Sequence, residues 1–137
     1  MKVMLDEKAF VPTRAHEADA GLDILTPIPF LIQSGQSIVI DTGVHIELPK
    51  DTVGFLKSKS GLCMNRNIVT EGGVIDEGYT GSIKVKLYNN GEDIQFFKAG
   101  EKITQLVILP VVKPSLEIVS VLDKTERGNN GFGSSGR

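Results

Sequence analysis

The feature that most constrains this chain is the alternation of apolar and polar residues with a period of two. In SIKVKLY, Ser82 to Tyr88, the residues Ile, Val and Leu alternate with two lysines, which predicts a strand with one buried face and one solvated face. QSIVIDTGVHIELP predicts two strands around Thr42-Gly43, and ITQLVILPVV and SLEIVSVL predict two more around Lys113-Pro114. At most a turn or two of helix is expected in GLCMNRN. Many short strands between turn residues indicate an all-β barrel or sandwich.

Bulk properties limit the classes of function. The chain has 137 residues, 40% of them hydrophobic, and a net charge of -2, so we expect one globular domain and no broad basic surface for nucleic acid. A small phosphorylated ligand needs only a few well-placed cations. The start MKVMLDEKAF is too charged for a signal peptide, and no apolar run approaches the roughly 20 residues of a membrane span. With Cys63 as the one cysteine, we expect a soluble, cytoplasmic protein.

A carboxylate follows an apolar run in the stretch EGGVIDEGYTG. Taken alone, the Asp-Glu-Gly that begins at Asp76 is typical of a hairpin turn. A carboxylate at the end of an apolar run is also well placed to take a proton from water. Tyr79 follows three residues later, where its ring can form the floor of a pocket. Both interpretations stay open on these residues alone.

Two other stretches carry groups that suit phosphate and metal. LKSKSGL, Leu56 to Leu62, combines lysines, hydroxyls and a glycine, which a phosphate group requires, although a solvated loop fits equally well. AHEADAGLDI, Ala15 to Ile24, holds Glu17, Asp19 and Asp23 close together. Mg²⁺ is bound by one or two carboxylates with waters and substrate phosphates, but an acidic surface loop explains the same pattern. Together with a flexible tail, these groups suit hydrolysis of a phosphate ester or anhydride.

Five short stretches resemble, in order and spacing, the five signatures of the homotrimeric dUTP pyrophosphatases, the dUTPases. They run from Asp19 to Gly136 and so cover nearly the whole chain. The five stretches are DAGLDI, SKSGL, GGVIDEGYTG, GEKITQLVILP and RGNNGFGSSG.

This resemblance implies a fold, an assembly and a reaction. The expected fold is a jelly-roll-like β-barrel over residues 1–126, followed by a flexible C-terminal arm over residues 127–137. The expected assembly is a homotrimer whose active sites lie between subunits. The expected reaction converts dUTP and water to dUMP and pyrophosphate with Mg²⁺, which limits uracil in DNA and supplies dUMP for dTMP synthesis.

The resemblance also implies roles for residues at the nucleoside. Asp76 is the base that activates water for attack on the α-phosphorus. Tyr79 packs beneath the deoxyribose and leaves no room for a 2′-hydroxyl group. Thr70 stands near the deoxyribose, where many members have asparagine. The hairpin that reads the uracil edge and excludes the thymine methyl group comprises Gly73, Val74, Ile75 and Lys84.

Around the phosphates, the resemblance assigns Asp23 to the metal ion through a water molecule. The phosphate-binding residues are Lys59, Ser60 and Gly61 from another subunit, and Gln105. Lys59 stands where the family usually has arginine, and it lacks the planar fork of that residue.

The tail RGNNGFGSSGR has the composition of a frayed terminus, but the resemblance makes it an arm over a neighbouring site. Phe132 is expected to stack on uracil and Arg127 to contact the γ-phosphate. Gly133 and Ser134 are expected to donate hydrogen bonds to phosphate oxygens. The arm should be ordered only with nucleotide bound. Two alternatives remain: a dCTP deaminase of the same fold, and a nucleotide-responsive regulatory binding protein.

Overall fold

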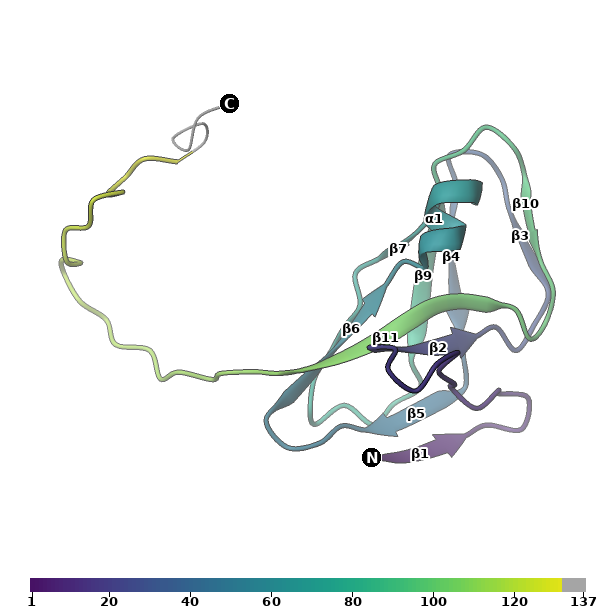
Figure 1. Ribbon diagram of the computed structural model, residues 1–137, viewed down its shortest axis with the longest axis horizontal. Coiled ribbons are helices and arrows are strands. Elements are labelled where there is room, and N and C mark those ends of the chain that lie inside the picture. The colour runs from purple at the N-terminus through teal and green to yellow at the C-terminus, as the bar shows by residue number, and fades with distance from the viewer. Residues whose placement is uncertain (132–137) are drawn as a thin grey trace.

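The computed structural model describes residues 1–131, and these form an all-β subunit with one short helix (Figure 1). All the strand pairs are antiparallel. They form sheets β1-β5, β10-β3, β2-β11-β6-β8 and β4-β9-β7. The jelly-roll-like β fold expected from the sequence is therefore confirmed. The elements are β1 (Lys2–Leu5), β2 (Gly21–Leu25), β3 (Phe30–Ile32), β4 (Ser37–Asp41), β5 (Val44–Glu47), β6 (Thr52–Lys57), α1 (Ser60–Arg66), β7 (Ile68–Glu71), β8 (Val74–Ile75), β9 (Lys84–Asn89), β10 (Gln95–Phe97) and β11 (Lys102–Pro110).

The core follows the alternation seen in the sequence. Ile83, Val85 and Leu87 are buried, while the two lysines between them are exposed. β9 lies between β4 and β7, so its apolar side chains enter the interior and its lysines face solvent. Each fully buried Val, Leu or Ile side chain stabilises the fold by about 1.5–3 kcal/mol. This stripe is therefore a principal reason why β9 occupies the centre of its sheet.

The helix α1 is fixed to the body at its C-terminal end. Its last residue, Arg66, donates to the Gln95 side chain at 2.8 Å and to the Phe96 carbonyl at 2.7 Å. The Arg66 guanidinium also lies 4.1 Å from the centroid of the Phe97 ring. Asn67 ends the helix in the left-handed conformation, with φ of 53°. At the other end of the helix, Lys59 is the N-cap residue.

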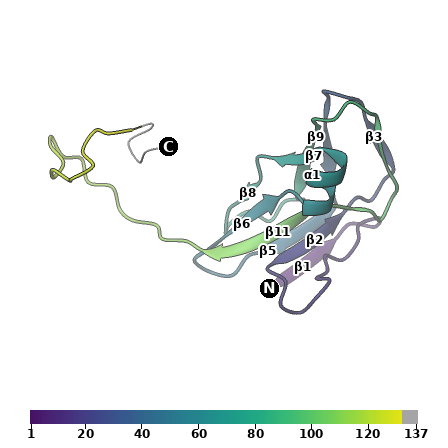
Figure 2. The ribbon, with the colours of Figure 1, turned by 45° about the horizontal axis from the view of Figure 1, so that its top comes forward.

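The chain leaves the body after β11, and residues 111–131 extend away from it (Figures 1 and 2). SLEIVSVL was expected to be a strand, but in the described part of the chain it pairs with nothing, and Leu116, Ile118 and Leu122 are at least 84% exposed. A strand exists only where a neighbour satisfies its backbone groups, so alternation without a partner leaves an irregular extension. The boundary between the β-barrel domain, residues 1–126, and the arm, residues 127–137, stays a prediction. It was placed where the arm is expected to begin its function, and the last strand ends earlier, at Pro110.

Candidate active site

A pocket of about 250 Å³ lies beside β8, at the hairpin that the sequence marked for the uracil ring. β8 is held by β6, with Gly54 opposite Ile75 and Phe55 opposite Val74. The structure thus brings six of the expected residues together, although their roles stay predictions. The lining residues are Gly73, Val74, Ile75, Asp76, Tyr79 and Lys84.

The entry to this hairpin requires glycine at position 73. Gly73 has φ of +95°, a conformation that L side chains rarely adopt, and a Cβ atom there would lie 2.6 Å from the Cβ of Leu56. Its carbonyl group accepts a hydrogen bond from the Leu56 N–H at 2.8 Å. The backbone at Gly73 therefore packs directly on β6, and the same residue lines the pocket.

Asp76 begins a tight turn at the edge of the pocket. The Tyr79 N–H donates to the Asp76 carbonyl at 3.0 Å, and the Tyr79 hydroxyl donates to the Ser82 carbonyl at 2.8 Å. These bonds fix the tyrosine ring at the pocket wall. The Asp76 side chain is exposed, so solvent water can reach its carboxylate.

A second group of expected residues surrounds Asp23 on β2. Asp23 is only 5% exposed, and each of its carboxylate oxygens meets a lysine. Lys59 forms an ion pair with Oδ1, and Lys102 lies 2.7 Å from Oδ2. Burial pushes the pKa of Asp23 upward, but the hydrogen bonds and charges of Lys102 and Lys59 outweigh it, so the pKa lies below its usual value. Asp23 is therefore held as a carboxylate.

Gln105 lies next to this carboxylate group, whereas Thr70 is bonded to Thr104, the preceding residue of β11. Gln105 is opposite Asp23 in the β2-β11 ladder, and its amide donates to the Ser58 carbonyl at 3.1 Å. A Cβ atom at Gly21 would lie 2.3 Å from the Gln105 Oε1, so glycine at that position makes room for the glutamine. The Thr70 hydroxyl donates to the Thr104 hydroxyl at 3.0 Å. Its bond ties β7 to β11 beneath the segment that carries Lys59.

The pocket at β8 and the group at Asp23 do not meet within one subunit. β8 and β2 are separated by three strand spacings, about 14 Å across the sheet. Ile75 lies opposite Gly54 on β6. Asp23 lies opposite Gln105 on β11, and Gln105 in turn lies opposite Lys57 on β6. Those three residues add about 10 Å along the strands. Within one subunit the pocket and the Asp23 group therefore lie at the two edge strands of the same sheet.

The root of the extension is tied to the turn that carries Asp76. The Val111 N–H donates to the Asp51 carbonyl at 3.0 Å, and the Asp51 N–H donates to the Glu77 carboxylate at 3.1 Å. Lys113 forms an ion pair with the same Glu77 carboxylate. The hydrogen bond from Lys113 holds the pKa of Glu77 below its usual value. The extension thus leaves the body beside the candidate base.

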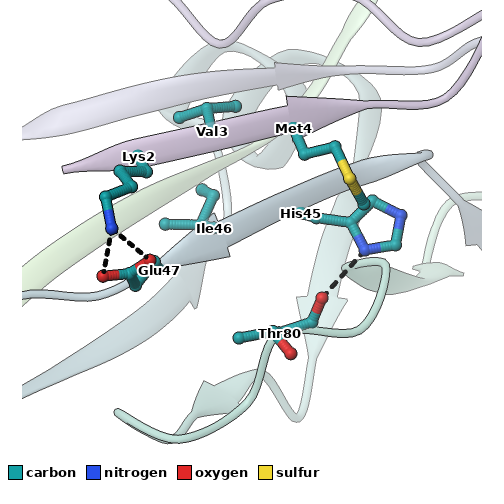
Figure 3. Close-up of a pocket in the computed structure, with 7 residues that line it drawn as sticks. All are labelled: Lys2, Val3, Met4, His45, Ile46, Glu47 and Thr80. Atoms are coloured by element: carbon teal, nitrogen blue, oxygen red, sulfur yellow. Dashed lines mark hydrogen bonds and ion pairs between the residues drawn. The ribbon is translucent and has the colours of Figure 1, made fainter.

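A separate groove of about 500 Å³ lies along β1 and β5 (Figure 3). At one end of the groove, the Lys2 ammonium and the Glu47 carboxylate form an ion pair at 3.1 Å. At the other end, His45 Nδ1 is 2.9 Å from the Thr80 carbonyl oxygen. His45 therefore holds the loop that follows Tyr79.

The arm is only partly described. Arg127 forms a local turn, in which its Nε donates to the Asn130 carbonyl at 3.1 Å. The expected ligands Phe132, Gly133 and Ser134 lie outside the described residues.

The donor groups around Asp23 fit a metal ion only if the nucleotide supplies most of its ligands. Within residues 1–131, no three His, Cys, Asp or Glu side chains gather closely enough to hold a metal by themselves. Mg²⁺ is commonly bound by one or two carboxylates plus waters and substrate phosphates. Asp23 is one such carboxylate, and Lys59 and Gln105 beside it suit phosphates.

Residues 1–131 contain no helix with the length and hydropathy needed to cross a bilayer.

Comparison of sequences identifies a family for this fold and site. The sequence profile described as dUTPase matches residues 7–136. A deoxyuridine 5′-triphosphate nucleotidohydrolase of Clostridium acetobutylicum is 40% identical over 134 residues, which is 96% of this chain and 92% of the relative. The corresponding protein of Rattus norvegicus is 38% identical over 98% of this chain and 66% of the relative.

Comparison with solved structures identifies the same family as the comparison of sequences. A mutant dUTPase of Staphylococcus bacteriophage 80alpha with dUpNHpp matches with a TM-score of 0.92 and 30% identity, over 99% of this chain and 98% of the other. A mutant dUTPase of Staphylococcus aureus phage phi11 matches with a TM-score of 0.80 and 30% identity, over 88% of this chain and 96% of the other. That phage enzyme coordinates a structural Mg(II) ion.

Proposed function

This chain belongs to the dUTPase family, and from that premise we propose how its own residues hydrolyse dUTP. The enzyme is a dUTP diphosphatase, which converts dUTP and water to dUMP and pyrophosphate. The two alternatives, a dCTP deaminase and a regulatory binding protein, are not favoured, because the matching relatives carry the name of the hydrolase.

Asp76 is the general base. Its carboxylate is exposed at the rim of the hairpin pocket, where it can accept a proton from the water that attacks the α-phosphorus. The new bond joins the water oxygen to that phosphorus, and the bond from phosphorus to the bridging oxygen of pyrophosphate breaks. General-base catalysis of this kind is worth about 10²–10⁴-fold in rate.

The hairpin selects uracil and deoxyribose. Gly73, Val74 and Ile75 line the pocket beside Lys84, and in this proposal their backbone groups read the polar edge of the ring. Because Gly73 packs tightly on Leu56, the hairpin cannot retreat to admit the methyl group of thymine. The Tyr79 ring supports the deoxyribose and excludes a 2′-hydroxyl group, and Thr70 contributes a hydroxyl near the same sugar.

The phosphates bind at the other half-site, which comes from a different subunit. Lys59, Ser60 and Gly61 lie at the start of α1, where backbone N–H groups lack intrahelical acceptors, and Gln105 lies beside them. Asp23 would help to hold Mg²⁺ through a water molecule, and the bound ion would supply positive charge against the charge that develops on the leaving pyrophosphate. Within one subunit the two half-sites lie at the opposite edge strands of one sheet, β8 and β2, which supports a site shared between subunits.

A homotrimer agrees with the surface of the extension. Leu116, Ile118 and Leu122 are almost fully exposed on one subunit, and apolar side chains of this kind favour burial against a neighbour. The arm that follows then reaches a neighbouring site, where Phe132 stacks on uracil and Arg127, Gly133 and Ser134 bind phosphate. A cytoplasmic location suits an enzyme of nucleotide supply, and cell fractionation tests it.

The observation that carries this proposal is the pocket in which Asp76 and Tyr79 meet the β8 hairpin. The experiment is hydrolysis in ¹⁸O-labelled water, with dUTP compared against dTTP, dCTP and UTP. We expect one labelled oxygen in dUMP, none in pyrophosphate, and turnover of dUTP far above the others. Label in pyrophosphate would contradict attack at the α-phosphorus, and ammonia release from dCTP would support the deaminase instead.

A further inference from the structure

Lys102 reaches Asp23 because of an irregularity at the start of β11. In a regular strand, residues an odd number apart point to opposite faces, so Lys102 and Gln105 would point away from each other. In the structure, Lys102 lies opposite Leu25 and Thr104 lies opposite Ile24. β11 therefore uses one residue more than β2 at this point, which is a β-bulge at Ile103.

The bulge changes which face of the sheet Lys102 occupies. Its partner Leu25 is two residues from Asp23 and shares its face, and Asp23 is opposite Gln105. Lys102 consequently joins Asp23 and Gln105 on one face, and its ammonium lies 2.7 Å from the Asp23 carboxylate. Bulges commonly re-aim a side chain beside an active site. No sequence pattern marks this one.

The carboxylate of Asp23 has more positive charge than it needs. One lysine is enough to neutralise a buried carboxylate, yet Lys59 and Lys102 occupy both oxygens. The group therefore carries one excess positive charge. The Lys102 side chain is 42% exposed and the Lys59 side chain 25% exposed, against 8% for Asp23. Lys102 is thus the cation that can leave the carboxylate for a ligand in solvent.

We propose that Lys102 is a further phosphate-binding residue, whose ammonium is held by Asp23 before nucleotide binds and moves to the nucleotide phosphates on binding. The inference rests on the proposed function, because it places phosphates beside Asp23. It also explains how Asp23 can meet a metal-bound water although both its oxygens are occupied. When Lys102 turns to the phosphates, Oδ2 becomes free to accept a hydrogen bond. Lys102 and that water therefore compete for one oxygen atom.

The experiment is titration calorimetry with a non-hydrolysable dUTP analogue, in EDTA and across a range of Mg²⁺ concentrations. Three variants are compared with the wild type: Lys102→Met, Lys102→Arg and Lys98→Met. Lys98→Met is the matched control, because Lys98 lies four residues away, is exposed, and its side chain makes no ion pair within the described residues. Asp23 retains Lys59 in each variant, so the fold should persist, and thermal melting checks this.

For Lys102→Met we expect two effects of opposite direction. Binding in EDTA should weaken by about fivefold at low salt, the size expected for one exposed charge contact. Mg²⁺ should strengthen binding of the analogue, and the Mg²⁺ concentration that produces half of this effect should fall by about twofold or more. The reason is that Oδ2 no longer has a competing lysine. Lys102→Arg should keep the binding in EDTA, and Lys98→Met should change neither quantity.

Two results would overturn the inference. If Lys102→Met binds like Lys98→Met, Lys102 does not contact phosphates. If Lys102→Met weakens binding but raises the Mg²⁺ midpoint, its role is only to hold Asp23 in place. Tripolyphosphate serves as a second probe without a base. Wild-type enzyme that fails to hydrolyse dUTP would defeat the proposed function, whereas wild-type turnover with unchanged Lys102→Met binding defeats this inference alone.

Discussion

Replacing Gly73 by alanine should damage both stability and substrate selection, and the neighbouring glycine provides the control. Gly73 and Gly72 both have positive φ, at +95° and +69°. A Cβ atom at Gly73 would lie 2.6 Å from the Leu56 Cβ, whereas one at Gly72 would meet nothing within 4 Å. The two substitutions therefore share a backbone penalty and differ in the steric clash.

The magnitudes follow from this difference. A left-handed alanine costs about 1–2 kcal/mol, partly offset by about 0.4–1 kcal/mol from a less flexible unfolded chain. The clash with Leu56, whose Cβ cannot swing away like the end of a long side chain, adds about 1–3 kcal/mol. We expect Gly73→Ala to lose about 2–4 kcal/mol and Gly72→Ala about 1 kcal/mol.

Scanning calorimetry at one fixed protein concentration measures the effect. At about 2.1 cal/mol/K of unfolding entropy per residue, Gly73→Ala should lower Tm by roughly 7–14 °C and Gly72→Ala by roughly 3 °C. Gly73→Ala should also raise KM for dUTP and narrow the preference for dUTP over dTTP, since the hairpin is displaced. Equal melting temperatures for the two variants, or an unchanged KM in Gly73→Ala, would refute the reasoning.

Four other outcomes test different parts of the site. Asp76→Asn should lower kcat by about 10²–10⁴-fold while analogue binding persists, and more than about a tenth of wild-type kcat would show that Asp76 is not the base. Because the folded pKa of Asp23 is lowered, its stabilisation is present above the usual carboxyl pKa, about 3.9, and is lost as the pH falls through the folded value. Urea unfolding of wild type and Asp23→Asn should therefore converge in stability on acidification, and a gap that is constant with pH would refute the linkage. Deleting Gly128–Arg137 should leave Tm nearly unchanged but reduce kcat, and Phe132→Trp fluorescence should respond to a dUTP analogue with Mg²⁺ more than to a dTTP analogue; a silent deletion or an indifferent signal would make the tail a frayed terminus.

The sequence predicts most of the fold because local chemistry decides it. The alternation in β9 places Val85 and Leu87 in the core, and the short helix appears where GLCMNRN lies. SLEIVSVL was also expected to be a strand, yet it forms none in the described chain. Periodicity reports which faces a strand would have, but it cannot supply the partner that makes the strand.

The proximity of site residues is predictable only where those residues are close together in the sequence. Asp76, Tyr79 and the hairpin glycines occur in one contiguous stretch, so their proximity follows from the chain itself. The role of Lys102 depends on a bulge at Ile103 and on register with β2, neither of which leaves a mark in the sequence. The second lysine at Asp23 therefore becomes visible only when the strands are paired.

The central claim is that Asp76 of one subunit works with an arm from another. The most direct measurement mixes Asp76→Asn with a variant that lacks Gly128–Arg137, unfolds and refolds them together, and assays dUTP hydrolysis. In an equal mixture, about a quarter of the sites should combine an intact base with an intact arm, because each is drawn at random from two kinds of subunit. We predict recovery to about a quarter of wild-type activity, whereas activity no greater than the average of the two separately refolded variants would contradict a site shared between subunits.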